Sequence, residues 1–272
     1  MKIILTSISI LAGLLVLIWL GLQIKPQPFS PYPERTPQLK TISLPSGLPA
    51  PVVRYYKLVY GDKVPVIDTV VIKGRAEISP FGAPIPARFI FVHNAGKDYR
   101  HYIEATWFGI PIMKVNESYV DGNSHFEIPI IGTFDNDPSI SQGANLAVWA
   151  EASWFPALWV TDPRVHWAAV DDKTALLYVP FGDKEENFVV RFHPDTGLIN
   201  TMEAMRFRDA GVQAKKILWI TQNVGEKKIA GTQINAVGSA TWLDQGKPWA
   251  VFTMEDVVYN VDVSQYIRQK GP

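Results

Sequence analysis

The first pattern along the chain is an uninterrupted apolar run from Ile3 to Ile24, IILTSISILAGLLVLIWLGLQI. Coiled as an α-helix at about 1.5 Å per residue, this run would span roughly 33 Å, which is enough to cross the hydrocarbon core of a bilayer. A cleaved secretory signal and an uncleaved anchor can both begin this way. The run is longer than a usual signal core and no small-x-small cleavage site follows it, so we predict a transmembrane anchor over residues 1–24.

The charges beside this run do not set its orientation. Lys2 and the terminal amine precede the run, while Lys25, Arg35 and Lys40 follow it, so the positive-inside rule does not favour a cytoplasmic N-terminus. A two-residue leader before a long apolar run is nevertheless arranged like a signal sequence. We therefore expect a single-pass protein of the cell membrane whose globular domain lies outside the cytoplasm.

A proline-rich segment follows from Lys25 to Pro51, KPQPFSPYPERTPQLKTISLPSGLPAP. Proline fixes φ and removes a backbone donor, so neither a helix nor a sheet interior is expected here. A peptide-recognition segment is one interpretation, but no P-x-x-P pair with a basic anchor stands out. We predict a semi-extended stalk over residues 25–51, which leaves residues 52–272 for one globular domain.

Two short helices are predicted within this domain. Apolar side chains at i, i+3, i+4 and i+7 indicate an amphipathic helix in Val52–Tyr60. In FDNDPSIS, Asp137 can cap a helix and Pro138 can take its first position, so a second helix should run to Phe155 and end before the next proline. A metal loop at Asp135 and Asp137 is the alternative, but the EF-hand glycine and distal glutamate are missing.

Most of the remaining domain consists of short apolar or alternating stretches between turn residues, which predicts strands. The expected strands are Thr69–Ile78, Ala87–Asn94, Tyr99–Trp107, Met113–Asp121, Ser124–Ile131, Val165–Val170, Ala175–Pro180, Asn187–His193, Leu198–Arg208, Ala214–Gln222, Thr232–Trp242 and Pro248–Val261. Asp121-Gly122 predicts a tight hairpin because these residues accept the positive φ of primed turns. We therefore predict an α+β fold: a curved, mainly antiparallel β-sheet (half-barrel) with two or more short helices, preceded by an N-terminal transmembrane helix.

Several of these strands carry large apolar residues on both faces. Tyr99, Ile103 and Trp107 alternate with Tyr102 and Phe108. Strict alternation of apolar and polar residues would leave one face in water. Either the helices and the stalk cover the second face, or that face lines a cavity whose aromatic walls would accept an apolar ligand.

A single carboxylate stands among the aromatic residues of WAEASWFPALW, which runs from Trp149 to Trp159. At about 100° per residue, Glu151 lies near the middle of an apolar helical face. The other residues of that face are Ala144, Ala147, Val148, Trp154 and Phe155. Removing an unpaired carboxylate from water costs several kcal/mol, so Glu151 must either take up a proton or meet a cation.

The candidate cations are Arg191 in FVVRFH and the pair Arg206 and Arg208 in MRFRD. An arginine on an inward strand face could bind Glu151 bidentately, as a buried ion pair that locks the helix to the sheet. The alternatives are a general acid or base with a raised pKa and a polar group that faces a ligand cavity. The predicted ligand-binding or ion-pair site therefore consists of Glu151, Trp154, Arg191, Arg206 and Arg208.

Composition excludes several classes of function. Hydrophobic residues make up 47% of the chain, and 26 Lys+Arg balance 26 Asp+Glu, so no basic field exists to bind nucleic acid. The absence of cysteine excludes disulfides, thiolate catalysis and Cys-ligated zinc. No Walker loop, dinucleotide fingerprint or nucleophile elbow is present, and the five histidines show no metal-binding spacing. The histidines are His93, His101, His125, His166 and His193. We expect neither a metal nor a cofactor.

The segment from Trp149 to Arg208 resembles a bacterial family of membrane-anchored proteins known only as a domain of unknown function. The resemblance rests on WAEASWFPALWVTDPRVHWAAVD, FVVRFHPDTGLI and MRFRD, which are similar to the family's A-E-x-x-W-F-P-x-A-L block, W-x-x-[VI]-D motif and strand pair ending near an arginine. The matching residues are Glu151, Trp154, Phe155, Pro156, Trp167, Asp171 and Arg206. The resemblance implies a curved half-barrel like those of lipoprotein carriers, and it implies no established activity.

Three functional hypotheses follow. The first is an envelope protein, anchored in the membrane, that holds a lipid or other apolar ligand in a sheet-lined cavity. The second is a non-enzymatic structural or interaction module with a filled core. The third, and weakest, is a hydrolase that uses Glu151 or Asp171. An apolar cavity beside Glu151 would favour the first hypothesis, and a packed interior around a paired Glu151 would favour the second.

Overall fold

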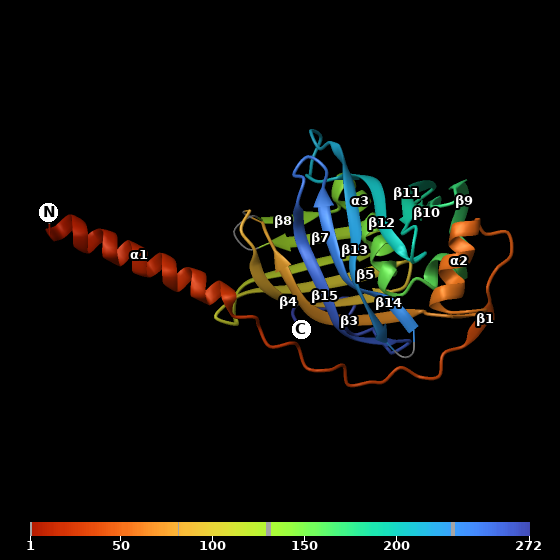
Figure 1. Cartoon of the computed structure of the whole chain (residues 1–272), viewed down its shortest axis with the longest axis horizontal. Coiled ribbons are helices and arrows are strands. Elements are labelled where there is room, and N and C mark those ends of the chain that lie inside the picture. Colours follow the sequence, from red (N-terminus) through yellow and green to blue (C-terminus); the bar gives the residue numbers. More distant parts are fainter. Residues whose placement is uncertain (1, 81, 129–131, 230–231) are drawn as a thin grey trace.

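The computed structural model describes residues 2–80, 82–128, 132–229 and 232–272 (Figure 1). Its helices are α1 (Lys2–Gln23), α2 (Ala50–Val59), α3 (Pro138–Glu151), the 3-10 helix η1 (Ala152–Trp154) and α4 (Leu158–Thr161). Its strands are β1 (Thr41–Ser43), β2 (Lys63–Pro65), β3 (Thr69–Ile78), β4 (Ile85–Asn94), β5 (Asp98–Trp107), β6 (Ile110–Val120), β7 (Asn123–Ile128), β8 (Gly132–Asp135), β9 (His166–Asp171), β10 (Thr174–Phe181), β11 (Lys184–Phe192), β12 (Ile199–Phe207), β13 (Lys216–Ile229), β14 (Thr232–Trp242) and β15 (Pro248–Tyr259).

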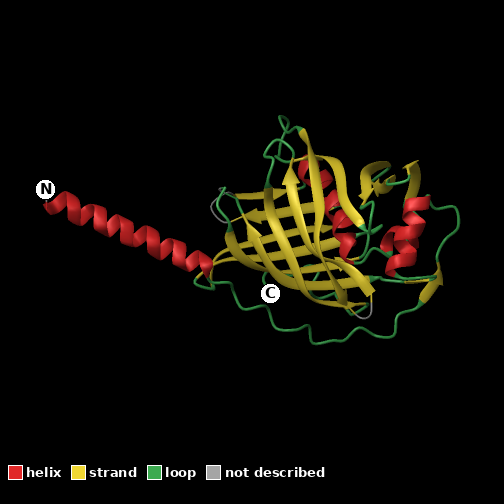
Figure 2. Ribbon diagram, in the orientation of Figure 1, coloured by secondary structure: helices red, strands yellow, loops and turns green. Residues whose placement is uncertain are grey.

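Thirteen of these strands form one antiparallel sheet. Their order is β8-β7-β6-β5-β4-β3-β15-β14-β13-β12-β11-β10-β9. Strands β3 to β8 form one arm of the sheet and β9 to β15 form the other, α3 connects the two arms in the chain, and β15 pairs with β3 to join them. Helix α3 packs against β6 and β7 in one arm and against β10 and β12 in the other. One helix can touch both arms only if the sheet curls around it, as Figure 2 shows. The predicted α+β fold with a curved antiparallel half-barrel is confirmed.

The local signals for α3 act as expected. The carboxylate of Asp137 accepts hydrogen bonds from the backbone N–H groups of Ser139 and Ile140, and Pro138 occupies the first turn. The α-helix ends at Glu151 and continues as η1 to Trp154, close to the predicted end at Phe155. Glu151 is therefore the last residue of α3, at the end of the helix that lies inside the curved sheet.

Other boundaries differ from the expected ones. Helix α2 begins at Ala50, two residues before the predicted start, because Pro51 is compatible with a first helical turn. Strand β13 extends to Ile229 rather than ending at Gln222, since its partner β14 pairs with it along that length. The short strands β1, β2 and β8 were not expected from the sequence. The end of the predicted strand Ser124–Ile131 falls on residues 129–131, which lie outside the described residues.

The inner face of the sheet holds the main core. Trp149, Phe155 and Trp159 are each at most 1% exposed, and the Trp159 indole N–H donates to the carbonyl of Trp149. The Trp167 indole N–H in turn donates to the carbonyl of Trp159. The indole N–H groups of Trp159 and Trp167 are thus satisfied within the core, whereas that of Trp154 is buried without a hydrogen-bond partner among the described residues.

The outer face is covered by the two ends of the chain. Tyr32 from the proline-rich segment packs with Val71, Ile90 and Val263 in a second apolar cluster. The Tyr32 hydroxyl donates to the carbonyl of Asp262, and the Thr36 hydroxyl accepts from the backbone N–H of Tyr259. The segment 25–49 is extended, as its prolines predict, but much of it lies along the sheet (Figure 1). It therefore covers part of the second apolar face, as one of our two alternatives proposed.

Candidate functional site

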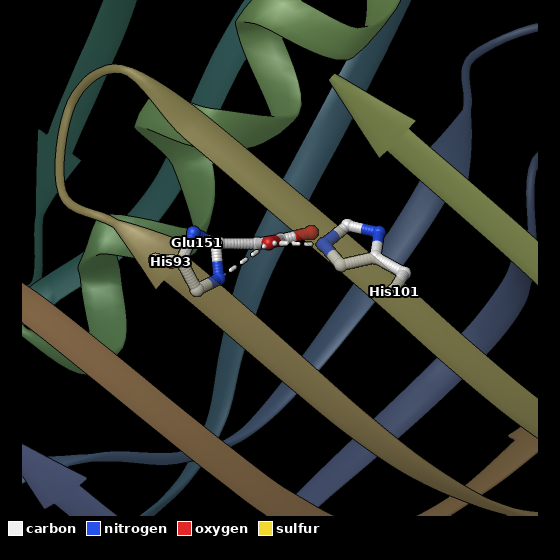
Figure 3. A group of neighbouring side chains, drawn as sticks. All are labelled: His93, His101 and Glu151. Carbon is white, nitrogen blue, oxygen red and sulfur yellow. Dashed lines mark hydrogen bonds and ion pairs between the residues drawn. The ribbon is translucent and has the colours of Figure 1, made fainter. Parts of the chain in front are cut away.

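Glu151 points from the end of α3 toward strands β4 and β5, where it meets two histidines (Figure 3). His93 lies opposite Tyr99 in the β4–β5 register, and His101 lies opposite Phe91. The two histidines are therefore on adjacent cross-strand pairs of the same, inward face. His93 is 0% exposed and His101 is 3% exposed.

One carboxylate oxygen serves both rings. Glu151 Oε2 lies 2.8 Å from His101 Nε2 and 3.1 Å from His93 Nε2. The first contact is a hydrogen bond, whereas neither ring nitrogen of His93 has a hydrogen-bond partner within the part of the chain that the structure describes. The three residues, His93, His101 and Glu151, form what we call the buried cluster.

A second carboxylate supports His101 from the other side. Glu117 on β6 is the cross-strand neighbour of His101, and its Oε2 lies 3.4 Å from His101 Nδ1. The Tyr99 hydroxyl donates to Glu117 Oε1 at 2.5 Å. His101 is thus held between two carboxylates, while the rings of Phe91 and Tyr99 stack on it at 3.8 and 4.0 Å.

The charges of the cluster are strongly coupled. Burial raises the pKa of Glu151, but the charge and hydrogen bond of His101, with His93, outweigh it and hold the pKa at about 2. Burial lowers the pKa of His101, but Glu151 and Glu117 raise it to about 9. Burial lowers the pKa of His93, and the opposing contribution of Glu151 is smaller. At neutral pH, Glu151 is therefore an anion, His101 a cation and His93 a neutral ring.

The expected ion pair between Glu151 and an arginine is not what the structure shows. Arg191 pairs with Glu203 at 2.7 Å, and Arg208 pairs with Asp244 at 2.8 Å, both at partly exposed positions. Glu151 points inward, and its charge is neutralised by the cationic His101 of β5, in the arm of the sheet that does not carry these arginines. The sequence could not show this, because His101 lies 50 residues before Glu151 in the chain.

Arg206 is the one predicted arginine that reaches the same region. Its guanidinium lies 4.3 Å from the ring of Trp219 and 5.6 Å from that of Trp242. Its Nε is buried and has no hydrogen-bond partner among the described residues. Burial lowers the pKa of Arg206, while Glu117, Tyr99 and Glu151 favour its charged form. Gly143 of α3 passes directly above, where a Cβ would come within 3.1 Å of Nε.

A cavity of about 110 Å³ lies between η1, the end of α3 and the inner face of the sheet. Its apolar and aromatic wall includes Phe91, Ile103, Trp154, Met202, Trp219 and Phe252. Its polar wall includes His101, Glu117, Glu151 and Arg206. Because a cavity of about 150 Å³ accepts benzene, this one has room for a comparable but somewhat smaller apolar group.

Of the remaining predicted residues, Trp154 lies in the cavity and Asp171 lies outside it. Trp154 lies in the cavity wall, 6.2 Å from the ring of Phe89 and nearly parallel to it. Asp171 is the exposed last residue of β9, and its carboxylate accepts from the backbone N–H of Lys173 in the turn that follows. Asp171 therefore does not join Glu151, which separates the two residues of the hydrolase hypothesis. We did not predict His93, His101 and Glu117 as site residues from the sequence. The one sequence feature that could have indicated them is their position on the same face of neighbouring strands.

The fold and site together define an α+β protein whose curved antiparallel sheet holds a small, mostly apolar cavity, with one apolar helix at its N-terminus. Within that helix, α1, the residues Ile4–Gln23 form a stretch that is long and apolar enough to cross a membrane or to serve as a signal sequence. The chain belongs to the family of unknown function DUF6544, whose model matches residues 38–254. No curated protein sequence matches it.

Three solved structures are similar to the chain. A LolA superfamily protein from Nitrosomonas europaea has a TM-score of 0.48 and 10% identity, over 84% of this chain and 98% of that one. A DUF1329 family protein from Desulfovibrio piger has a TM-score of 0.41 and 14% identity, over 74% and 89%. A putative outer membrane lipoprotein-sorting protein domain from Vibrio parahaemolyticus has a TM-score of 0.41 and 8% identity, over 79% and 91%. The family model confirms the expected membership of a family of unknown function.

Proposed function

We propose that this protein is anchored in the cell membrane by α1 and binds a lipid-like amphiphile in the cavity beside Glu151. The ligand would place an apolar group against Trp154 and Phe252 and an anionic or carbonyl oxygen at Arg206. A fatty acid has this chemistry. The bound part would be a short segment of the molecule, because the cavity measures about 110 Å³.

The observation that carries this proposal is the buried Nε of Arg206, which has no hydrogen-bond partner among the described residues and lies at the edge of an apolar cavity. Buried donors normally have acceptors, and leaving a charged one without them costs free energy. Glu117 and Glu151 already contact His101, and the described residues make no hydrogen bond to Arg206. A carboxylate or ester oxygen entering the cavity would supply the missing acceptor with a charge-assisted bond.

The anchoring half of the proposal is supported by the contact between α1 and the β5–β6 hairpin. The Trp107 indole N–H donates to the carbonyl of Ile18, and the Phe108 backbone N–H donates to the carbonyl of Gly21. Next to them, Ile110 and Ile112 are 66% and 59% exposed. Apolar groups beside the end of a spanning helix suit the membrane interface, so this end of the domain would rest on the bilayer.

The experiment compares two arginines of the same segment. The full chain in detergent is titrated with dodecanoate while tryptophan fluorescence is followed, since Trp154 and Trp219 line the cavity. We expect Arg206→Met to weaken binding about tenfold or more, the equivalent of one lost charged hydrogen bond. Arg208→Met should bind like the wild type, because Arg208 pairs with Asp244 outside the cavity.

A second pair of variants tests the apolar wall. Met202 lines the cavity and is 1% exposed, whereas Met205 on the same strand is 48% exposed. Met202→Trp should fill the cavity and abolish binding, and Met205→Trp should leave it unchanged, with circular dichroism confirming that both variants fold. Equal binding by all variants, or no saturable binding by the wild type and no lipid retained in native mass spectrometry of membrane extracts, would favour a structural module with no ligand.

A further inference from the structure

The buried cluster gathers three potential metal-ligand atoms from three elements. One nitrogen of His93, one nitrogen of His101 and one oxygen of Glu151 all lie within 4.8 Å of one another. They come from β4, β5 and the end of α3, so no local sequence motif connects them. All three side chains point to one spot in Figure 3.

We propose that His93, His101 and Glu151 bind a divalent first-row transition metal ion, with zinc as the best match to their chemistry. Two imidazole nitrogens and one carboxylate oxygen are a common set of protein ligands in zinc sites that leave a fourth position open. The absence of cysteine from the chain makes this nitrogen and oxygen set the form such a site would take here.

His93 provides the observation that an ion pair alone does not explain. The ring is 0% exposed, and its Nε2 makes an ion-pair contact of 3.1 Å with Glu151 Oε2 that does not meet hydrogen-bond geometry. Its Nδ1 has no hydrogen-bond partner among the described residues. A buried polar nitrogen without a hydrogen-bond partner is costly, and the large majority of buried side-chain polar atoms have one. A metal ion between Nε2 and the carboxylate would satisfy both groups. Its binding would release the proton that His101 carries in the metal-free protein, because only a neutral imidazole binds metal.

Two of the three separations between the ligand atoms are already close to those of a zinc site, and all three are within 4.8 Å. Ligand bonds of about 2.0–2.2 Å at tetrahedral angles place ligand atoms about 3.3 Å apart. The observed separations from Glu151 Oε2 are 2.8 Å and 3.1 Å, so the carboxylate would move outward by a few tenths of an ångström. Its side chain retains 16% exposure toward the cavity, which leaves space for that movement.

The surroundings resemble those of a metal site beyond the three ligands. Glu117 contacts the other ring nitrogen of His101, 3.4 Å from Nδ1, and would orient the ring and increase the basicity of Nε2. Tyr99 fixes Glu117 in turn through its hydroxyl. Because His101 and Glu151 line the cavity and His93 does not, the open position of the ion would face the cavity. A water molecule or an oxygen of the ligand could occupy it.

The protein contains its own control. His125 lies 2.5 Å from Asp135 and 3.6 Å from Glu127, so it also combines a histidine with carboxylates, but at the surface. Adventitious zinc would bind such an exposed cluster. The variants to compare are therefore His101→Gln and Glu151→Gln in the buried cluster, and His125→Gln outside it.

The test uses the full chain purified in detergent without a histidine tag and treated with a chelator. Zinc is added and the bound ion is counted by mass spectrometry and by calorimetry. We expect one ion per chain, and an increase in the melting temperature of about 5–10 °C at about a hundredfold excess over Kd. His125→Gln should keep both effects, whereas His101→Gln and Glu151→Gln should lose them.

Cobalt(II) provides a measurement that does not depend on the folding of variants. In wild-type protein it should give the intense visible bands of a four-coordinate nitrogen and oxygen site, and X-ray absorption of the zinc form should show two imidazoles. The proposal is overturned if wild-type protein binds no zinc at micromolar concentration. It is equally overturned if His125→Gln alone removes binding, or if the absorption data show only water and carboxylate ligands.

Discussion

Two clusters in this protein combine histidines with carboxylates, one buried in the core and the other at the surface. In the buried cluster, His93 and His101 share Glu151 beneath the sheet. In the surface cluster, which consists of His125, Asp135 and Glu127, the side chains are 28%, 62% and 39% exposed. Contact distances are similar in the two clusters, so distance alone does not decide how much either cluster contributes to the stability of the fold.

The difference lies in solvent. Water screens the surface charges, and such pairs stabilise a fold by at most about 1 kcal/mol. Beneath the sheet, the same attraction acts in a medium of lower dielectric constant, and each charge depends on its partner because water cannot replace it. Consistent with this, the pKa of His101 is raised to about 9 and that of Glu151 is lowered to about 2.

The largest expected difference between the clusters concerns their carboxylates. Glu151→Ala should reduce the free energy of unfolding by about 3–5 kcal/mol, because it leaves the buried His101 without its nearest counter-charge. Asp135→Ala should cost at most about 1 kcal/mol after screening. Urea unfolding of the full chain in detergent at neutral pH, in the presence of a chelator, measures both. Equal losses for the two variants would contradict the distinction between the clusters.

A smaller difference is expected for the second carboxylate of each cluster. Glu117→Gln keeps a hydrogen-bond acceptor for Tyr99 but removes the charge beside His101, so we expect a loss of about 1–2 kcal/mol. Glu127→Gln should not change the urea midpoint measurably, since Glu127 is exposed. The same unfolding curves provide the result. If Glu117→Gln left the free energy of unfolding unchanged, Glu151 alone would hold His101 in its charged form.

The smallest expected effect is the response to salt. Raising sodium chloride from about 0.05 M to about 0.5 M shortens the Debye length from about 14 Å to about 4 Å, which screens surface pairs. The loss caused by Asp135→Ala should therefore shrink toward zero, while the loss caused by Glu151→Ala should stay the same. The comparison repeats the unfolding series at both concentrations. A salt-sensitive Glu151→Ala would mean that water reaches the buried cluster freely.

Much of the fold could be predicted from local patterns. The cap at Asp137 and the first-turn proline located α3, and the spacing of Val52, Tyr55, Tyr56 and Val59 located the buried face of α2. These signals act within a few residues, so they do not depend on how the rest of the chain folds. The length of β13 and the short strands β1, β2 and β8 depend on partners elsewhere in the chain, and their sequences carry no comparable signal.

The site divides in the same way. Helical periodicity turned Glu151 inward, and the cost of burying a carboxylate required a cation near it. Which cation it met depended on which strand lies opposite, and the expected Arg191 and Arg208 pair instead with Glu203 and Asp244. Sequence spacing carries no information about this choice, because the histidines come from a different arm of the sheet.

The sequence alone determined that the chain has an apolar N-terminal helix, a strand-rich α+β domain and one charged group turned into its core, since each follows from periodicity, composition and the cost of desolvation. The tertiary structure decided which residues surround that charge. The curvature of the sheet brings β4 and β5 to the end of α3, where His93 and His101 contact Glu151, and places Arg206 in the wall of the same cavity. Strand order and register set these distances, and both arise only when the whole sheet closes around the helix.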